Sequence, residues 1–156
     1  MVDTDEALKL DNQFCFALYA LSRKVTALYR PLLKPLGLTY PQYLVMLVLW
    51  ERAADEASSE WEGIPVKNLC TRLHLDTGTL TPLLKRMEQQ GLIQRKRSHS
   101  DEREVRLTLT EAGQSLKAQA SSVPVSMLCQ SHLPMDRIGP LQTELRQLLA
   151  MMESPE

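Results

Sequence analysis

Apolar side chains recur at helical spacing along most of the chain, beginning near its N-terminus. From about Asp5 to Leu33 they step by four and three residues, which predicts one long helix with a heptad seam. The seam consists of Phe14, Leu18, Leu21, Val25, Leu28 and Leu32. Pro31 and Pro35 end this helix in the prediction, because proline removes a backbone donor.

A second helix is predicted to begin at Thr39. Its hydroxyl can cap the helix, and Gln42, three residues later, can return the hydrogen bond. The run from Tyr43 to Trp50 is apolar almost all round, so this helix should be buried. Residues 52–63 are acidic, rich in Ala and Ser, and without periodicity. We expect them to form the end of the helix and a surface excursion.

Two short helices are predicted on either side of Leu75 and Asp76, as in a helix-turn-helix. The first begins near Pro65, and Asp76 is a typical N-cap for the second. Gly91 ends the second helix, since glycine accepts the left-handed conformation of a C-cap. Pro82 leaves two starting points open. The helix begins after Asp76 and contains Pro82, or it begins at Thr81 with the proline in its first turn.

A strand is predicted after this helix pair, where apolar Val105, Leu107 and Leu109 alternate with polar residues. It pairs across a charged loop with the basic segment 94–97. A helix pair followed by a basic two-stranded loop is typical of a winged helix-turn-helix, which binds duplex DNA.

Two more helices follow the wing in the prediction. Thr110 caps one that reaches about Gln130, with a bend at Pro124, and Asp136 begins the last. Both terminal regions carry more apolar surface than a small winged helix can cover. The predicted fold is therefore mainly α with a small β-wing, in an intertwined homodimer. Residues 37–110 form the winged helix-turn-helix region, and residues 1–36 and 111–156 form the helical dimerisation region.

The formal charge of −1 conceals an uneven distribution. From Lys85 to Arg106 there are seven Lys or Arg and four Asp or Glu, a net of +3, so the remainder carries −4. This concentration of basic charge fits a DNA-contacting segment. No run approaches the roughly 20 apolar residues of a membrane span, and the acidic N-terminus is unlike a signal peptide. Three cysteines do not suggest a disulfide framework, so we expect a cytoplasmic protein.

A second stripe on the first helix carries a thiol and two phenols. Its members are Cys15, Tyr19, Ser22, Thr26 and Tyr29. Cys15 and Tyr29 lie roughly 21 Å apart along the axis, so they cannot touch within one chain. They meet if the first helices of two chains cross antiparallel near Ser22. A phenol that donates to sulfur favours the thiolate, which attacks peroxide. In the alternative, Cys15 is a small apolar residue in a dimer core. Cys15 is expected too far along its helix for an effect of the helix N-terminus.

The remaining cysteines lie close to histidines in the sequence. Cys70 and His74 are four residues apart, and Cys129 and His132 are three apart, both workable spacings for metal ligands. A zinc site needs three or four ligands, and nothing brings the two pairs together. We therefore expect no metal and no cofactor, and we interpret Cys70 as a core residue.

Four stretches of the chain, between about Leu8 and Ala120, resemble winged-helix repressors of the MarR type, and among these the organic hydroperoxide resistance regulators. They are NQFCFALYA, LTYPQYLVMLVLWE, LDTGTLTPLLKRMEQQGLI and RKRSHSDEREV. The resemblance implies that Cys15 is the peroxidatic cysteine, which an organic hydroperoxide oxidises to a sulfenic acid. It implies that Tyr29 and Tyr40 of the other subunit hold the thiolate, with Tyr19 beside them. It also implies that Cys129 resolves the sulfenic acid as an intersubunit disulfide, although some members trap a small thiol instead.

The resemblance also implies a set of DNA-contacting residues. Those of the major-groove helix are Thr77, Gly78, Thr79, Thr81, Pro82, Lys85 and Arg86. At the wing tip Arg103 would enter the minor groove, braced by Asp101, and we add Arg95 and Arg97 of the basic strand.

These observations predict a redox-sensing repressor that binds a palindromic operator when reduced and releases it when Cys15 is oxidised. Two alternatives stay open. A repressor of the same fold could be released by a phenolic or lipophilic ligand at the dimer interface, with Cys15 structural. A cysteine-dependent peroxidase would also use Cys15, but the chain has no CxxC motif and its DNA-binding half would be unused, so we do not expect an enzyme.

Overall fold

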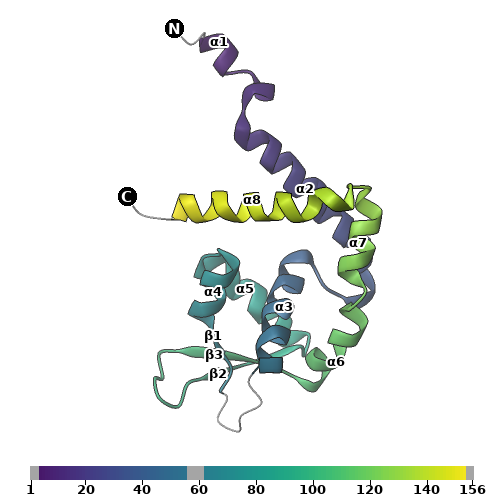
Figure 1. The fold of residues 1–156 in the computed structure, drawn as a ribbon. Coiled ribbons are helices and arrows are strands. Elements are labelled where there is room, and N and C mark those ends of the chain that lie inside the picture. The colour runs from purple at the N-terminus through teal and green to yellow at the C-terminus, as the bar shows by residue number, and fades with distance from the viewer. Residues whose placement is uncertain (1–3, 56–61, 154–156) are drawn as a thin grey trace.

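The computed structural model describes residues 4–55 and 62–153, and Figure 1 shows their arrangement. In chain order the elements are α1 (Thr4–Ala7), the 3₁₀ helix η1 (Leu10–Asn12), α2 (Phe14–Leu33), the 3₁₀ helix η2 (Lys34–Leu36), α3 (Tyr40–Asp55), β1 (Ile64–Pro65), α4 (Val66–Leu73), α5 (Thr77–Gln89), β2 (Ile93–Arg97), β3 (Val105–Leu109), α6 (Glu111–Ala120), α7 (Val123–Ser131) and α8 (Met135–Glu153). The predicted fold class, mainly α with a small β-wing, is confirmed. The predicted excursion at 52–63 lies partly outside the described residues, and α3 continues to Asp55.

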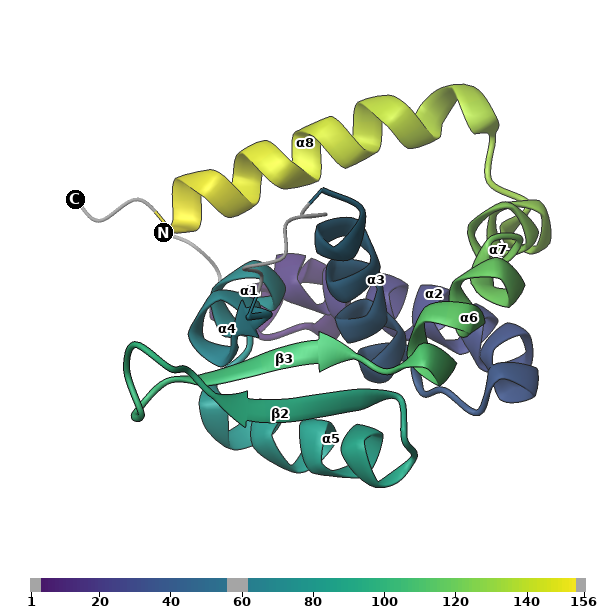
Figure 2. The ribbon, with the colours of Figure 1, turned by 90° about the horizontal axis from the view of Figure 1, so that it is seen from below.

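The wing is a small antiparallel sheet with the strand order β1-β3-β2. β2 and β3 pair from Ile93↔Leu109 to Arg97↔Val105, and Figure 2 shows them as a two-stranded ribbon that ends in the wing loop. The short strand β1 was not predicted: Pro65 was assigned to the start of the following helix, and Ile64 was assigned to no element. It joins the other edge of β3 through Ile64↔Leu107.

The core lies between α3, the helix pair α4 and α5, and the sheet. The run from Tyr43 to Trp50 is buried as predicted, apart from half-buried Leu44 and exposed Leu47. The other members of the core include Leu69, Leu80, Leu84, Met87, Ile93 and Leu107, all of which are fully buried. Trp50 donates its indole N–H to the carbonyl of Gly113 at 2.9 Å, which fixes α3 against α6.

The predicted caps are present. Gln42 and Thr39 exchange hydrogen bonds at the start of α3, and Gly91 has a φ of 73° just after α5. Asp76 accepts the Thr79 N–H at 2.8 Å, so α5 begins at Thr77 and Pro82 lies inside it. The proline cannot bond the carbonyl four residues earlier, and the helix nevertheless continues through it.

The prediction of one helix from Asp5 to Leu33 is wrong. The chain forms α1 and η1 before α2 begins at Phe14. Amide side chains bond the backbone at this break: Asn12 donates to the Glu6 carbonyl at 2.7 Å, and Gln13 donates to the Lys9 carbonyl at 3.1 Å. Such bonds offer the backbone carbonyls an alternative to helical partners.

The helix predicted from Thr110 to about Gln130 is also two helices. α6 ends at Ala120 and α7 begins at Val123, with Pro124 in its first turn. Pro124 has no N–H to bond the carbonyl of Ala120, which ends the first helix. Pro31, in contrast, lies inside α2, which reaches Leu33 and therefore does not end at the first proline.

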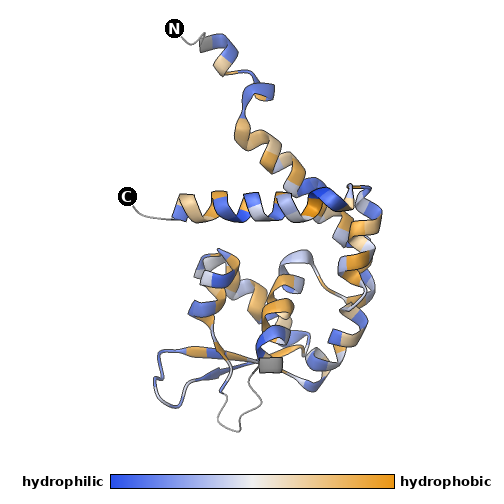
Figure 3. Ribbon diagram, in the orientation of Figure 1, coloured by the Kyte–Doolittle hydropathy of each residue, from blue (hydrophilic) through white to orange (hydrophobic). Residues whose placement is uncertain are grey.

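The terminal helices α2 and α8 carry many apolar residues (Figure 3), and several of these side chains are exposed. Phe14, at the start of α2, is 70% exposed, and none of the described residues of α8 is buried. A groove of about 520 Å³ runs between α2, α7 and α8, lined mainly by apolar side chains that include Val25, Met127 and Leu145. Within the described residues no individual helix has the length and apolar composition of a membrane span; Phe14–Leu36 and Tyr40–Ala53 reach them only together, across a bend of 71°.

Candidate functional site

Cys15 occupies the second position of α2, in the first turn of the helix, and its side chain is exposed. The expectation that it lies too far along its helix for an effect of the helix N-terminus is therefore wrong. The N–H groups of a first turn have no partners within the helix, and the helix dipole places positive charge there. Both effects favour an anionic group near such a turn.

The rest of the predicted stripe follows Cys15 along α2. Tyr19 is exposed, and Arg23 engages it: Nη1 donates to the phenol oxygen at 3.0 Å, and the guanidinium lies 5.5 Å from the ring centroid. Thr26 donates to the Ser22 carbonyl at 2.8 Å. Within one chain, Tyr19 is therefore paired with Arg23, and much of its ring remains exposed.

Tyr29 and Tyr40, which were predicted to hold the thiolate, lie together where α2 meets α3. Their ring centroids are 4.7 Å apart. Tyr43 was not assigned to the site from the sequence. Its ring centroid lies 5.9 Å from that of Tyr29, and the residue is 2% exposed. Its position three residues after Tyr40 puts both rings on one face of α3, and that spacing was the available signal.

The phenols of this cluster are held in the neutral form. Burial, together with the neighbouring phenols of Tyr40 and Tyr43, raises the pKa of Tyr29 to about 12. Burial also raises the pKa of Tyr40, and burial with the Tyr40 phenol raises the pKa of Tyr43. These three hydroxyls make no hydrogen bond to another described residue, and none of them is an enclosed atom without a partner, so they open to solvent. The cluster therefore presents protonated donors without an acceptor in their own chain.

The structure does not bring Cys15 to these phenols within one chain. Cys15 and Tyr29 lie on the same continuous helix, fourteen residues apart, which corresponds to roughly 21 Å along the axis. The other two thiols are separate from both. Cys129 is exposed on α7, which packs along α2, and half-buried Cys70 lies 3.8 Å from the Thr77 hydroxyl.

The two Cys–His pairs with workable ligand spacing do not form a common cluster among the described residues. His74 contacts Glu153 at the end of α8, with Nδ1 2.6 Å from the carboxylate. In the part of the chain that the structure describes, no three His, Cys, Asp or Glu side chains come together as metal ligands would.

The predicted major-groove residues lie along α5. Thr77, Gly78, Pro82, Lys85 and Arg86 are exposed. The other two hydroxyls are used inside the helix, because Thr79 donates to the Asp76 carboxylate at 2.7 Å and Thr81 donates to the Thr77 carbonyl at 2.7 Å. The bonds from Thr79 lower the pKa of Asp76, so this cap stays ionised.

The predicted wing residues fall into two groups. At the tip, Asp101 accepts the backbone N–H of exposed Arg103 at 2.9 Å, so it braces the turn and leaves the guanidinium to solvent. Arg97 donates to the Glu102 carbonyl at 3.3 Å. Arg95 is different: its Nε lies 2.9 Å from Glu88 of α5, and the same carboxylate accepts its backbone N–H at 3.2 Å. This ion pair ties β2 to α5.

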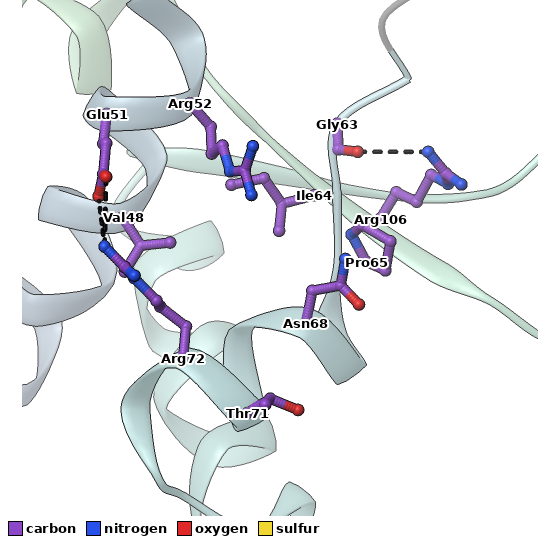
Figure 4. A pocket seen from close by; sticks show the side chains of 10 residues that line it. All are labelled: Val48, Glu51, Arg52, Gly63, Ile64, Pro65, Asn68, Thr71, Arg72 and Arg106. Atoms are coloured by element: carbon purple, nitrogen blue, oxygen red, sulfur yellow. Dashed lines mark hydrogen bonds and ion pairs between the residues drawn. The ribbon is translucent and has the colours of Figure 1, made fainter. Parts of the chain in front are cut away.

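A polar pocket that the sequence did not predict lies between α3, β1, α4 and β3, with a volume of about 560 Å³. Figure 4 shows Arg72 turned toward Glu51, which accepts its Nη2 at 3.1 Å, and Arg106 donating to the Gly63 carbonyl. Arg106 also donates to Glu104 at 2.7 Å. These two guanidinium groups have partners within the chain, so they join elements around the pocket and do not present open anion-binding charge.

Three comparisons with known proteins bear on this arrangement. The family model described as transcriptional regulator SarA/Rot matches residues 27–120. The organic hydroperoxide resistance transcriptional regulator of Bacillus subtilis (strain 168) is 49% identical over 142 residues, which are 91% of this chain and 90% of that protein. The structure of reduced AbfR bound to DNA matches with a TM-score of 0.70 and 37% identity, over 96% of this chain and 99% of that one. Disulfide-formed AbfR, a protein of Staphylococcus epidermidis, matches with a TM-score of 0.58 and 36% identity, over 93% and 96%.

Proposed function

The chain belongs to the MarR-type winged-helix transcriptional regulators, among the organic hydroperoxide resistance regulators, and we propose that it represses transcription until Cys15 is oxidised. Membership in a family of DNA-binding regulators points away from an enzyme. In this proposal the protein is a homodimer that binds double-stranded operator DNA in the cytoplasm. Organic hydroperoxide is its oxidant.

In the reduced dimer the Cys15 thiolate accepts hydrogen bonds from Tyr29 and Tyr40 of the partner subunit. The observation that carries this proposal is the phenol cluster, whose hydroxyls stay protonated and have no acceptor among the described residues of their own chain. The position of Cys15 in the exposed first turn of α2 also supports the proposed contact, because the thiol is accessible to a partner subunit. An antiparallel crossing of two α2 helices near Ser22 would bring the two groups together.

Oxidation then proceeds in two steps. The thiolate attacks the terminal peroxide oxygen, the O–O bond breaks, and the alkoxide leaves and takes a proton from solvent, which yields a sulfenic acid and an alcohol. The Cys129 thiol of the partner subunit attacks the sulfenic sulfur, and water leaves as the disulfide forms. Changing the ratio of DNA-binding to non-binding dimers from 99:1 to 1:99 takes about 5.5 kcal/mol. A covalent crosslink between groups that start apart can supply this free energy by displacing the two subunits.

DNA recognition follows from α5 and the wing. Each α5 would lie in the major groove with exposed Lys85 and Arg86 toward the DNA, and Arg103 would reach the adjacent minor groove. Residues 37–110 form this DNA-binding region, and residues 1–36 and 111–156 the dimerisation region. A two-fold dimer matches a palindromic operator with half-sites about one helical turn apart.

A mobility-shift assay on operator DNA with cumene hydroperoxide tests the proposal. We expect wild type to release DNA and Cys15→Ser to stay bound, whereas Cys70→Ser, the matched control, responds like wild type. Non-reducing electrophoresis after stoichiometric oxidant should show a crosslinked dimer that is lost in both Cys15→Ser and Cys129→Ser. Release of DNA from oxidised Cys15→Ser would show that the switch lies elsewhere. Release by a phenolic ligand under reducing conditions would favour a ligand-controlled repressor.

A further inference from the structure

One buried polar side chain connects the phenol cluster to the recognition helix. Gln42, in the first turn of α3, is 4% exposed. Its Nε2 donates to Oε1 of Gln90 at 2.9 Å, across 48 residues of sequence. Gln90 in turn donates its own Nε2 to the Gly37 carbonyl at 3.4 Å. The two carboxamides therefore join the α2–α3 connection to the end of α5.

The same Gln42 side chain also holds the start of α3. Its Oε1 accepts the Thr39 N–H at 2.9 Å and the Thr39 hydroxyl at 3.2 Å. Tyr40 lies between these two residues in the sequence, and its ring lies against that of Tyr29. A movement of Tyr40 that shifts the first turn of α3 therefore moves the carboxamide that Gln90 contacts.

Gln90 is well placed to pass such a movement to DNA. It is the C-cap residue of α5, and its backbone N–H bonds the Arg86 carbonyl at 2.9 Å. The helix has 13 residues, so its far end, capped by Asp76, lies roughly 20 Å away. A small rotation at the C-terminus of a rigid helix displaces its N-terminal turn by a larger distance, and that turn carries Thr77 and Gly78.

We propose that the Gln42–Gln90 hydrogen bond couples the Tyr29–Tyr40 pair to the orientation of α5, so that Gln42 and Gln90 are positioning residues of the redox switch. This inference rests on the proposed function. A directional bond to a buried amide suits the role, because leaving such a donor unpaired in a low-dielectric site is costly and the two groups therefore move together.

The test is the ratio of the operator Kd of oxidised protein to that of reduced protein, measured by fluorescence anisotropy after treatment with cumene hydroperoxide. In Gln90→Ala we expect this ratio to fall at least about fivefold below wild type, in the range of ordinary allosteric couplings. The rate at which Cys15 forms its sulfenic acid should stay within about twofold of wild type, because the sensing groups are unchanged.

Three further variants separate the hydrogen bond from general stability. Gln90→Leu keeps most of the volume without an acceptor and should behave like Gln90→Ala. Gln90→Glu keeps an oxygen for Gln42 and should restore the ratio. Gln89→Ala changes an exposed neighbour on the same helix and should match wild type. A loss of stability alone would change both Kd values together and leave the ratio intact.

A wild-type ratio in Gln90→Ala, or in Gln90→Leu, overturns the coupling and leaves the proposed function standing. A ratio of one in wild-type protein whose Cys15 is fully oxidised refutes the proposed function, and the coupling with it.

Discussion

The winged helix and the terminal helices differ in how far each is complete within one chain. In the winged helix, Leu84 and Leu107 are fully buried, and the caps at Asp76 and Gly91 are formed. In α8, by contrast, none of the described residues is buried, although apolar residues follow one face. The first region satisfies its own packing, and the second leaves apolar surface for another chain, as in obligate dimers.

The proposed sensor spans this boundary. Tyr40 and Tyr43 belong to the complete region through α3, whereas Cys15 lies on the exposed first turn of α2. One half of the proposed site lies on the winged helix, which packs within one chain, and the other half lies on α2, which leaves apolar surface exposed. The complete site therefore forms only when two subunits assemble. In this proposal, assembly and chemical sensing are properties of the same surface.

The largest contrast should come from the core of the winged helix. Leu84→Ala removes a side chain that is 1% exposed and should lower the free energy of unfolding by about 2–5 kcal/mol, from lost burial and the cavity left behind. Urea denaturation followed by circular dichroism measures this. Leu47→Ala, at a 40% exposed position of α3, is the control and should cost much less. Equal losses at the two positions would contradict the assigned core.

On the terminal helices the effect should fall on assembly. Leu145→Asp places a charge on the apolar face of α8, where Leu145 is 38% exposed. We expect sedimentation velocity to show monomers. Operator affinity should fall about 100-fold, because the two winged helices are no longer linked and each binds its half-site separately. Gln147→Asp, exposed on the opposite side of the helix, is the matched control and should remain dimeric. A dimer in Leu145→Asp would place the interface elsewhere.

The smallest effect should be a pH dependence at the junction of the two regions. The pKa of Tyr29 is raised to about 12 from 10.0, so the folded state holds a proton that the unfolded chain releases. The resulting stability is complete below pH 10 and is lost as the pH rises toward 12. In Tyr29→Phe the free energy of unfolding should decline less steeply between pH 10 and pH 12. Tyr19→Phe, at an exposed ring, is the control, and an unchanged slope in Tyr29→Phe would show that Tyr29 is not the group responsible.

Local signals in the sequence predicted the winged helix well. The residues that decide it, such as Asp76, Gly91 and the Thr39–Gln42 pair, act within three or four positions of the helix ends they define. The features that were missed depend on distant partners or on competition between local bonds. β1 has two residues and forms only because Leu107 lies opposite Ile64. The break before Phe14 depends on side-chain amides that bond the backbone in place of a helical turn.

The candidate site was predictable to the same extent. The stripe on the first helix supplied Cys15 and Tyr29, the resemblance added Tyr40, and the structure brings the two tyrosines together. The third phenol, Tyr43, and the Gln42–Gln90 contact were not predicted, because pairs of residues from different helices leave no periodic signal. The proposed pairing of Cys15 with Cys129 stays a prediction.

The ion pair between Arg95 and Glu88 has a consequence for the DNA. One carboxylate accepts hydrogen bonds from both the guanidinium and the backbone N–H of Arg95, so β2 of the wing is fastened to α5 at this point. In the proposed complex we therefore expect the protein to set the distance between the major groove under α5 and the minor groove under the wing tip, and the separation of the two half-sites to vary more easily. We expect operators to tolerate a changed spacer at their centre better than an inserted base pair within either half.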